Sequence, residues 1–309
     1  MRAGVLLGAV LLSGFAGAAE PAKPPPRTYP LAAKSLVLAA AVAGDSLVTV
    51  GDRGFILSSS DNGQTWKQHS SPVEVMLTGL HMSSATHGWA VGHDAVILNT
   101  TDGGVTWTEK FKDADLQTPL FDIWFENAMR GIAVGAYGLI LETGDGGATW
   151  AERRISEDEP HLYTITPLNG AVYAVGELGS VFKSTDAGAN WTALESPYAG
   201  TFFGGLALKD GGLLVYGLRG NLFRSDDGGG SWTALKTDTE ASLLGATQRA
   251  DGSVVVVGLS GTILTSADGR TFTRTTLADR EALGGAVETA SGKLLLLGEK
   301  GAHPWEAPR

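Results

Sequence analysis

The sequence predicts an all-β fold, a seven-bladed β-propeller of four-stranded blades, and three observations carry this prediction. A motif recurs seven times along the 309 residues, at spacings of 40 to 43 residues. Each copy contains short apolar runs bounded by Gly or Asp, which is the pattern of buried strands. Apart from an N-terminal apolar run, no segment shows a helical period. A repeat of about 40 residues with four short strands is typical of a propeller blade.

The first motif is an apolar run, a Gly, two variable residues and usually a second Gly before more apolar residues. It reads VGDRGFIL at Val50, VGAYGLIL at Val134 and VGLSGTIL at Val257. We expect each GxxG to form a tight hairpin turn between the second and third strands of a blade, because Gly can take a positive φ. The first glycines of the seven copies are Gly51, Gly92, Gly135, Gly176, Gly217, Gly258 and Gly298.

The second motif, S/T-x-D-x-G-x-T/S/N-W, follows five of these hairpins, and a shorter sixth copy ends at Phe272. Its Asp can accept backbone N–H bonds within a turn, and its aromatic ring can pack between sheets. Five equivalent catalytic carboxylates around a ring make no chemical sense. We therefore interpret the motif as a structural Asp box between the third and fourth strands of a blade. The boxes contain Asp61 and Trp66, Asp102 and Trp107, Asp145 and Trp150, Asp186 and Trp191, and Asp227 and Trp232.

The N-terminus has the pattern of a signal peptide over residues 1–18. Arg2 precedes an apolar run at 5–15, and Ala16-Gly17-Ala18 forms a small-x-small cleavage site. The run is shorter than the ~20 residues that span a bilayer, and an uncleaved anchor is the alternative. We expect residues 19–26 to be a Pro-rich tether, residues 27–309 to form one propeller, and the mature protein to be periplasmic or secreted.

The last repeat has no sequence for a fourth strand before Arg309. An open propeller would expose unpaired strand edges. We therefore expect residues 27–31 (RTYPL) to supply the outer strand of the last blade. Pro30 is compatible only with an edge strand.

The charge balance excludes some classes of partner. The net charge is −10, and removal of residues 1–18, which contain Arg2, leaves 22 minus 33, or −11. An acidic chain disfavours nonspecific nucleic-acid binding, and no basic amphipathic stretch would hold it to a membrane. The six histidines are scattered without i, i+4 pairs, and no phosphate loop is present. We predict no metal, no cofactor, no nucleic-acid partner, no direct membrane insertion and a monomeric state.

The repeated VGxxG and TDGGxTW motifs together resemble the photosystem II assembly and stability factor family of seven-bladed propellers. The resemblance covers nearly all of the mature chain. It implies a non-catalytic accessory role, with a membrane-protein subunit held during assembly. Photosynthetic members carry an arginine-rich patch, whereas the basic residues at comparable hairpin positions here are only Arg53, Arg219 and Lys300. This departure implies a different client, such as an envelope transporter or secretion complex.

In such a ring, the turns between strands two and three share a face with the loops between blades, and the Asp boxes lie on the opposite face. Loops on a rigid scaffold carry function, and Arg and Tyr are enriched at protein interfaces. The predicted partner-binding residues are Arg53, His93, Asp94, Tyr137, Glu177, Arg219, Lys300, Arg153 and Arg154, with Glu299, His161, Tyr198, Phe202 and Phe203 as further candidates.

No catalytic residue is predicted, because a sialidase needs three converging arginines and only Arg53 and Arg219 are in register. The alternative function is an Asp-box glycosidase or carbohydrate-binding propeller, with Glu177 and Asp94 as the carboxylate pair to test. Carboxylates and stacking aromatics in the central funnel would favour this alternative, and a flat face with several arginines would favour the assembly factor. A structural envelope protein without a separable ligand is the third possibility.

Overall fold

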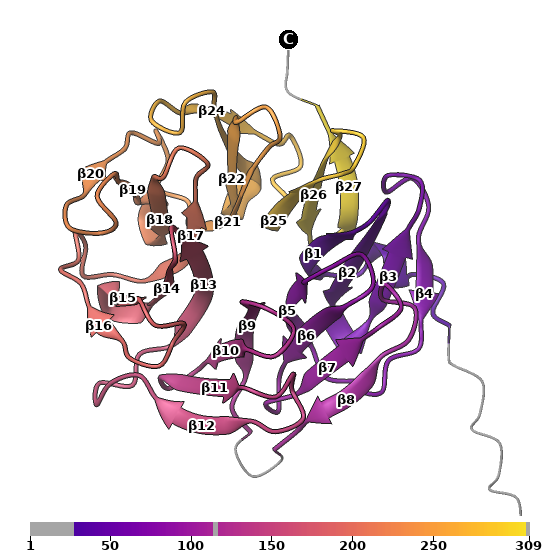
Figure 1. The fold of residues 1–309 in the computed structure, drawn as a ribbon. Coiled ribbons are helices and arrows are strands. Elements are labelled where there is room, and N and C mark those ends of the chain that lie inside the picture. Colours follow the sequence, from indigo (N-terminus) through magenta and orange to yellow (C-terminus); the bar gives the residue numbers. More distant parts are fainter. Residues whose placement is uncertain (1–27, 114–116, 307–309) are drawn as a thin grey trace, which may run out of the picture.

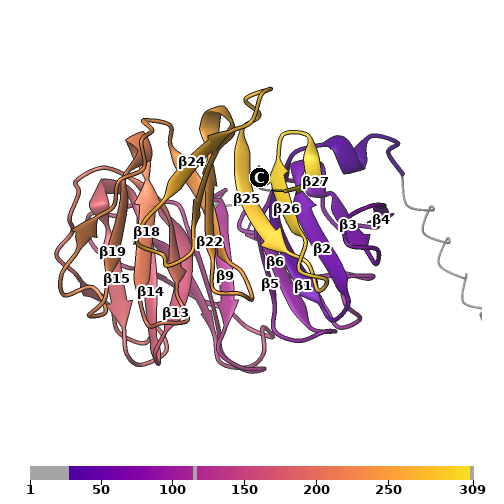
Figure 2. The ribbon, with the colours of Figure 1, turned by 90° about the horizontal axis from the view of Figure 1, so that it is seen from above.

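The computed structural model describes residues 28–113 and 117–306 as seven antiparallel sheets arranged in a ring (Figure 1). Viewed from above, the sheets stand side by side in a single layer around the ring (Figure 2). The prediction of an all-β, seven-bladed propeller is confirmed. The predicted signal peptide and tether lie outside the described residues.

The strands follow one another around the ring, and each sheet is one blade in chain order. Short 3-10 turns lie at η1 (Ala32–Lys34), η2 (Asp52–Gly54), η3 (Glu177–Gly179), η4 (Leu218–Gly220) and η5 (Leu259–Gly261). The strands are β1 (Val37–Ala43), β2 (Ser46–Gly51), β3 (Ile56–Ser59), β4 (Lys67–His69), β5 (Leu77–Met82), β6 (Gly88–Gly92), β7 (Ile97–Thr100), β8 (Thr108–Phe111), β9 (Leu120–Phe125), β10 (Gly131–Gly135), β11 (Leu139–Thr143), β12 (Ala151–Arg154), β13 (Leu162–Leu168), β14 (Ala171–Gly176), β15 (Val181–Ser184), β16 (Thr192–Ala193), β17 (Phe202–Ala207), β18 (Leu213–Gly217), β19 (Leu222–Ser225), β20 (Thr233–Ala234), β21 (Leu243–Gln248), β22 (Val254–Gly258), β23 (Thr262–Ser266), β24 (Thr273–Thr276), β25 (Leu283–Glu288), β26 (Leu294–Gly298) and β27 (Gly301–Trp305).

The closure of the ring differs from the prediction. In the described residues, blades 1 to 6 have four strands, but blade 7 contains only β25, β26 and β27. The predicted outer strand at residues 27–31 is therefore wrong in its described part. Tyr29 lies instead against blade 1, where its N–H donates to the Gln68 side chain at 2.8 Å and its ring packs on Phe55. Packing closes the ring, because β1 contacts β25 and β26, and η1 contacts β27.

The core lies between the blades, since each sheet has both faces covered by its neighbours. Side chains of β9 and β10 alternate between the two sides: Ile123 and Ala133 pack toward blade 2, whereas Val134 packs toward blade 4. The box aromatics complete these layers. Trp107 joins the core between blades 1 and 2, and Trp150 packs edge-on against Trp89 of blade 2.

The Asp boxes form turns that are closed by hydrogen bonds to the Asp side chain. The Oδ1 atom of Asp102 accepts hydrogen bonds from the N–H groups of Val105 (3.1 Å) and Thr106 (2.9 Å), and Oδ2 accepts from the Thr106 hydroxyl at 2.6 Å. These bonds favour the ionised carboxylate. Side-chain and backbone hydrogen bonds of this kind lower the pKa to about 2 at Asp61, Asp145, Asp186, Asp227 and Asp268.

The GxxG segments form the predicted hairpin turns, but the first glycine does not take the positive φ that was expected of it. The first Gly is extended, with φ −169° at Gly176, and the left-handed residues are the third and fourth of the turn, as at Leu178 (φ 56°) and Gly179 (φ 71°). A Cβ on Gly176 would lie 2.0 Å from the carbonyl oxygen of His161. The first Gly is thus required by the close approach of the inter-blade loop, not by its own φ.

Candidate functional site

The ring has two chemically distinct faces. On the turn face, the GxxG turns bind the inter-blade loops: Gly138 N–H donates to the Pro160 carbonyl, and Glu177 N–H donates to the His161 carbonyl, both at 2.9 Å. On the opposite box face, Gly103 of an Asp box donates to the carbonyl of Thr86 in the first hairpin of its blade. The predicted division between turns and boxes therefore holds.

A β-bulge lies near the start of every inner strand, on the turn-face side. One residue in each of the seven strands falls out of register with the second strand. A bulge bends a strand and re-aims a side chain. The seven bulged residues are Leu38, Thr78, Phe121, Tyr163, Phe203, Leu244 and Gly284.

Three consecutive bulges, on blades 3 to 5, carry aromatic rings. The Phe121 and Tyr163 rings have centroids 5.0 Å apart, and those of Tyr163 and Phe203 lie 5.4 Å apart. His161 packs edge-on against Tyr137 at 4.7 Å, and Phe121 lies 6.3 Å from the same His161 ring. These five residues form a continuous aromatic strip across three blades. Tyr137 is exposed over 56% of its surface, whereas the other four rings are half-buried.

Glu177 fixes the polar edge of the aromatic strip. Its Oε1 atom accepts a hydrogen bond from the Tyr163 hydroxyl at 3.3 Å, and its Oε2 atom accepts one from the backbone N–H of His161 at 3.4 Å. Burial, with Glu177 as the second cause, raises the pKa of Tyr163 to about 12, so this hydroxyl stays a neutral donor. His161 Nδ1 accepts the Tyr137 N–H at 2.9 Å, which leaves Nε2 as the protonated nitrogen of the neutral ring.

The borders of the strip carry more acidic than basic groups. The inter-blade loop that ends at His161 reads Glu157-Asp158-Glu159, all exposed. Arg154 donates to the Tyr137 carbonyl at 3.1 Å and pairs with Glu152, so its charge is partly compensated. The strip is therefore an apolar surface with an acidic border.

Asp122 lies on β9 directly after the bulged Phe121. Its Oδ2 atom accepts the Ile165 N–H of β13 at 2.9 Å, so the carboxylate joins the inner strands of blades 3 and 4. Part of the residue is accessible, yet burial of the carboxyl group dominates and raises its pKa to about 7. The site thus contains a group that titrates near neutral pH.

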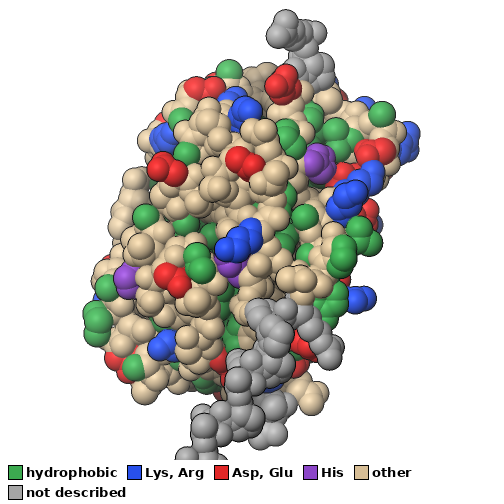
Figure 3. Space-filling view, turned by 90° about the vertical axis from the view of Figure 1, so that its right-hand side faces the viewer, with side chains coloured by type: hydrophobic (Ala, Val, Ile, Leu, Met, Phe, Trp, Pro, Cys, Tyr) green, Lys and Arg blue, Asp and Glu red, His purple; other side chains and the backbone are tan. Residues whose placement is uncertain are grey.

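The other predicted residues are distributed around the ring. The turns of blades 1, 2, 5 and 7 carry Arg53, His93, Asp94, Arg219 and Lys300, and among the described residues no hydrogen bond, ion pair or ring contact joins these side chains to the aromatic strip. Arg53 pairs with Asp52, and Lys300 pairs with Asp279. On the side of the ring that carries blades 1 and 2, acidic and basic side chains are scattered among each other (Figure 3).

Three sequence candidates do not lie free on the turn face. Arg153 reaches the Asp box of blade 4, where it donates to the carbonyls of Gly188 and Ala189 and pairs with Glu142. Phe202 is fully buried, and Tyr198 packs on it. The neighbouring Phe203 lies in the strip because it occupies the bulge position of the repeat, whereas Phe202 pairs with Gly217 and points into the core. Phe121 and Tyr163 were not among the predicted residues, although an alignment of the seven inner strands places both at the bulge position of Phe203.

Within the described ranges, no group of three or more His, Cys, Asp or Glu side chains is arranged to hold a metal ion. No helix among the described residues is long and apolar enough to cross a membrane.

Fold and site together define a seven-bladed Asp-box propeller with an aromatic strip on its turn face. The profile of the family described as photosynthesis system II assembly factor YCF48 matches residues 58–118 and 110–275. The match covers more than half of the chain, and the chain belongs to this family. The resemblance inferred from the repeated motifs is confirmed.

Known proteins extend this comparison. A photosystem II stability/assembly factor, HCF136, from Cyanidioschyzon merolae is 36% identical over 67 residues, which is 21% of this chain and 15% of that protein's length. Solved structures share the fold at lower identity. YCF48 bound to a D1 peptide is 19% identical with a TM-score of 0.74, covering 89% of this chain and 93% of that one. Virginiamycin B lyase from Staphylococcus aureus is 14% identical with a TM-score of 0.76, covering 87% and 93%.

Proposed function

We propose that this chain is an exported, non-catalytic assembly or accessory factor that holds a segment of a membrane protein on its turn face. The observation that carries the proposal is the aromatic strip of blades 3 to 5, together with membership of the assembly-factor family. The D1 peptide bound by a family member supports a membrane-protein segment as the class of client. The signal-peptide pattern at residues 1–18 supports a periplasmic or secreted location, where the client would be a subunit of an envelope complex such as a transporter.

The strip suits an apolar protein segment. Aromatic rings supply large contact areas at low entropic cost, and Tyr is enriched at the centres of interfaces. The acidic loop 157–159 and Glu177 would favour a client segment with basic residues beside its apolar ones, since complementary charge steers association. This differs from the arginine-rich patch that the family resemblance implies for photosynthetic members.

In-cell crosslinking tests this proposal. A photoreactive residue at Tyr137 or Leu178, which are 56% and 70% exposed on the turn face, is expected to capture one inner-membrane protein. The same residue at Val105, 49% exposed in an Asp box on the opposite face, is the matched control and should not capture it. Equal capture from both faces, or capture of nothing specific, would contradict the assembly-factor function.

A carbohydrate-binding propeller is the second candidate, favoured by the presence of aromatic rings beside Glu177. The rings meet one another at interplanar angles of 34° and 60°, so they pack mainly as a cluster rather than as parallel platforms for sugar rings. A glycan array with the purified mature protein separates the two functions. Saturable glycan binding that is lost in Tyr163→Ala, with no protein captured in cells, would establish the second candidate.

A further inference from the structure

Each Asp box rests on the preceding blade through a turn glycine. A Cβ on Gly104 would lie 2.7 Å from Val48 of blade 1, and one on Gly188 would lie 2.3 Å from Ile132 of blade 3. The box of blade 1 does the same across the closure of the ring, where Gly63 approaches Leu295. Val48, Ile132 and Leu295 share one register in the second strand, since each lies opposite the next-to-last residue of the third strand. We call this surface of a blade the box seat.

In blades 4 and 5, a side chain of the third strand completes the seat by donating to a carbonyl of the box turn. Lys183 Nζ of blade 4 donates to the Gly228 carbonyl at 3.3 Å, and Arg224 Nη1 of blade 5 donates to the Gly269 carbonyl at 3.4 Å. In the strand register, Lys183 lies opposite Tyr173 and Arg224 lies opposite Leu214, so the two donors occupy equivalent positions in their blades. The seats of blades 4 and 5 thus combine an apolar floor with a cationic donor at one edge.

Blade 6 presents a seat that no box of the described chain occupies. Val255 is its floor residue, and it pairs with Thr265 in the register of Lys183 and Arg224. In blade 6, the Asp box begins at Ser266, which lies opposite Val254 in the second strand. Trp305 lies opposite Leu294 at the same register of blade 7. After Trp305, only Glu306 is described, and no box forms within the described residues.

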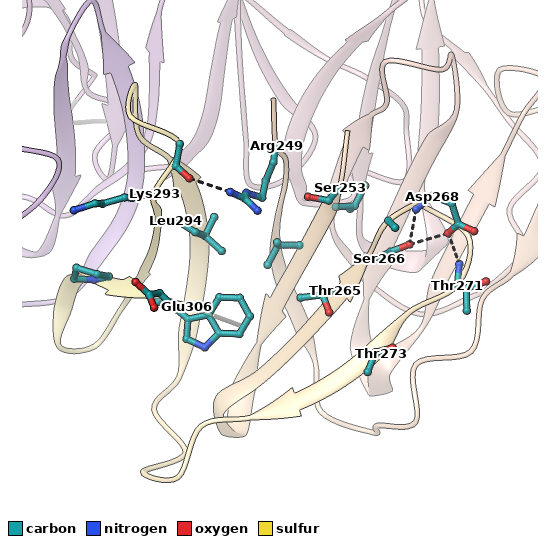
Figure 4. Close-up of a pocket in the computed structure, with 16 residues that line it drawn as sticks. Arg249, Ser253, Thr265, Ser266, Asp268, Thr271, Thr273, Lys293, Leu294 and Glu306 are labelled. Atoms are coloured by element: carbon teal, nitrogen blue, oxygen red, sulfur yellow. Dashed lines mark hydrogen bonds between the residues drawn. The ribbon is translucent and has the colours of Figure 1, made fainter. Parts of the chain in front are cut away.

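A groove of about 760 Å³ lies at this position, between blades 6 and 7. Figure 4 shows its two walls, with Thr265 and Thr273 on blade 6 facing Leu294 on blade 7, and Arg249 reaching across the far end. Arg249 donates to the Gly292 carbonyl at 2.9 Å and pairs with Glu288, so it holds the two blades together there. The floor and the blade 7 wall are apolar, because Val254, Val255 and Trp305 line them.

We propose that this groove, the vacant box seat, binds a box-like turn of another polypeptide: a glycine-containing turn followed closely by Trp or Phe. The occupant is argued from the fold itself, which fills the corresponding seat of every other blade with such a segment. A volume of this size is typical of ligand sites, and a buried aromatic ring supplies the large contact area that a short segment needs. The site lies away from the aromatic strip and does not depend on the function proposed for it.

Peptide binding to the full mature chain tests the proposal. The probe is a labelled peptide with the sequence of residues 99–110, NTTDGGVTWTEK, and the measurement is fluorescence anisotropy. We expect saturable binding that falls at least tenfold when the peptide Trp is replaced by Ala. Thr265→Arg is expected to tighten binding about threefold to tenfold, because it restores the donor of Lys183 and Arg224. Its matched control, Thr265→Glu, places the opposite charge there and should weaken binding.

A fusion variant tests the proposal without changing any residue of the groove. A chain in which residues 99–110 are fused after Glu306 fills the seat in cis, and it should lose binding of the free peptide. Circular dichroism verifies that each variant is folded. The proposal is overturned if the wild-type chain does not bind the peptide, if the cis-filled chain binds it equally, or if free indole binds as tightly, since the turn would then contribute nothing.

Discussion

The carboxylate of Asp122 on β9 accepts the backbone N–H of Ile165 on β13 at 2.9 Å, which places an acidic group between the inner strands of two blades. The corresponding residues of other blades are small, as at Gly79, Gly204 and Gly245. Gly79 and Gly245 approach the backbone of the next inner strand, where a side chain would collide. Asp122 replaces this close approach with a hydrogen bond, beside the aromatic strip.

This arrangement predicts a pH dependence of stability. Burial raises the folded-state pKa of Asp122 to about 7, above the value of about 4 in an unfolded chain. Between these values the folded state binds more protons, so the contribution of Asp122 to the free energy of unfolding falls as pH rises. The slope reaches at most about 1.4 kcal/mol per pH unit. Asp122→Asn should remove this slope, which denaturant titrations of both proteins at pH 5, 6, 7 and 8 would measure.

The comparison with Asp122→Asn is needed because other groups also titrate. Burial lowers the pKa of His69 and His81, so their contribution weakens as pH falls through their unfolded-state pKa of about 6.5. Only the difference between wild type and variant isolates Asp122. Identical slopes in the two proteins would mean that this carboxyl group stays ionised throughout.

The Asp boxes should contribute to stability and not to partner binding. Asp102→Ala removes the acceptor of two backbone N–H groups and one hydroxyl, and we expect the free energy of unfolding to fall by about 1–2 kcal/mol. Glu109→Ala on β8 of the same blade is exposed and serves as the control, with almost no change. Chemical denaturation measures both. A loss of client capture at unchanged stability in Asp102→Ala would assign the boxes a binding role instead.

The GxxG turns predict a strong contrast between two glycines of blade 4. A Cβ at Gly176 would meet the His161 carbonyl oxygen at 2.0 Å, and Gly176→Ala should destabilise the protein by about 3 kcal/mol or more. Gly170 has φ 78° but nothing within 4 Å of its Cβ position, so Gly170→Ala should cost only about 1 kcal/mol of backbone strain. Thermal unfolding of the two variants ranks them. If Gly170→Ala were the more destabilising variant, backbone φ rather than the close approach of the His161 carbonyl would be the reason for a glycine at these positions.

The aromatic strip predicts where client binding is lost. Leu178→Asp places a charge on the exposed turn beside Glu177, and we expect it to reduce capture of the membrane protein at least fivefold without lowering Tm. Leu259→Asp makes the same change on the equivalent turn of blade 6, away from the strip, and should leave capture unchanged. Quantitative mass spectrometry of crosslinked cells provides the readout. Equal losses in both variants would indicate a contact spread around the whole face.

Much of the fold follows from local sequence because a propeller repeats one local unit. Each strand pairs with the next along the chain, so period, strand order and turn positions can be deduced from Gly92, which recurs in every blade, and from Asp102, which recurs in blades 1 to 6. The structural role of the boxes follows equally, since the Asp binds backbone groups three and four residues away. The signal peptide and the tether stay predictions.

Contacts between blades could be decided only in three dimensions. The bulges that align Phe121, Tyr163 and Phe203 join residues about 40 positions apart, and only the shared repeat position, not the neighbouring sequence, distinguishes Phe203 at the site from Phe202 in the core. The closure of the ring likewise depended on packing, because β1 meets β25 without an added strand. The local hydrogen bonds of each blade are therefore determined by the sequence itself, whereas the aromatic strip, the environment of Asp122 and the groove of blade 6 exist only where blades meet.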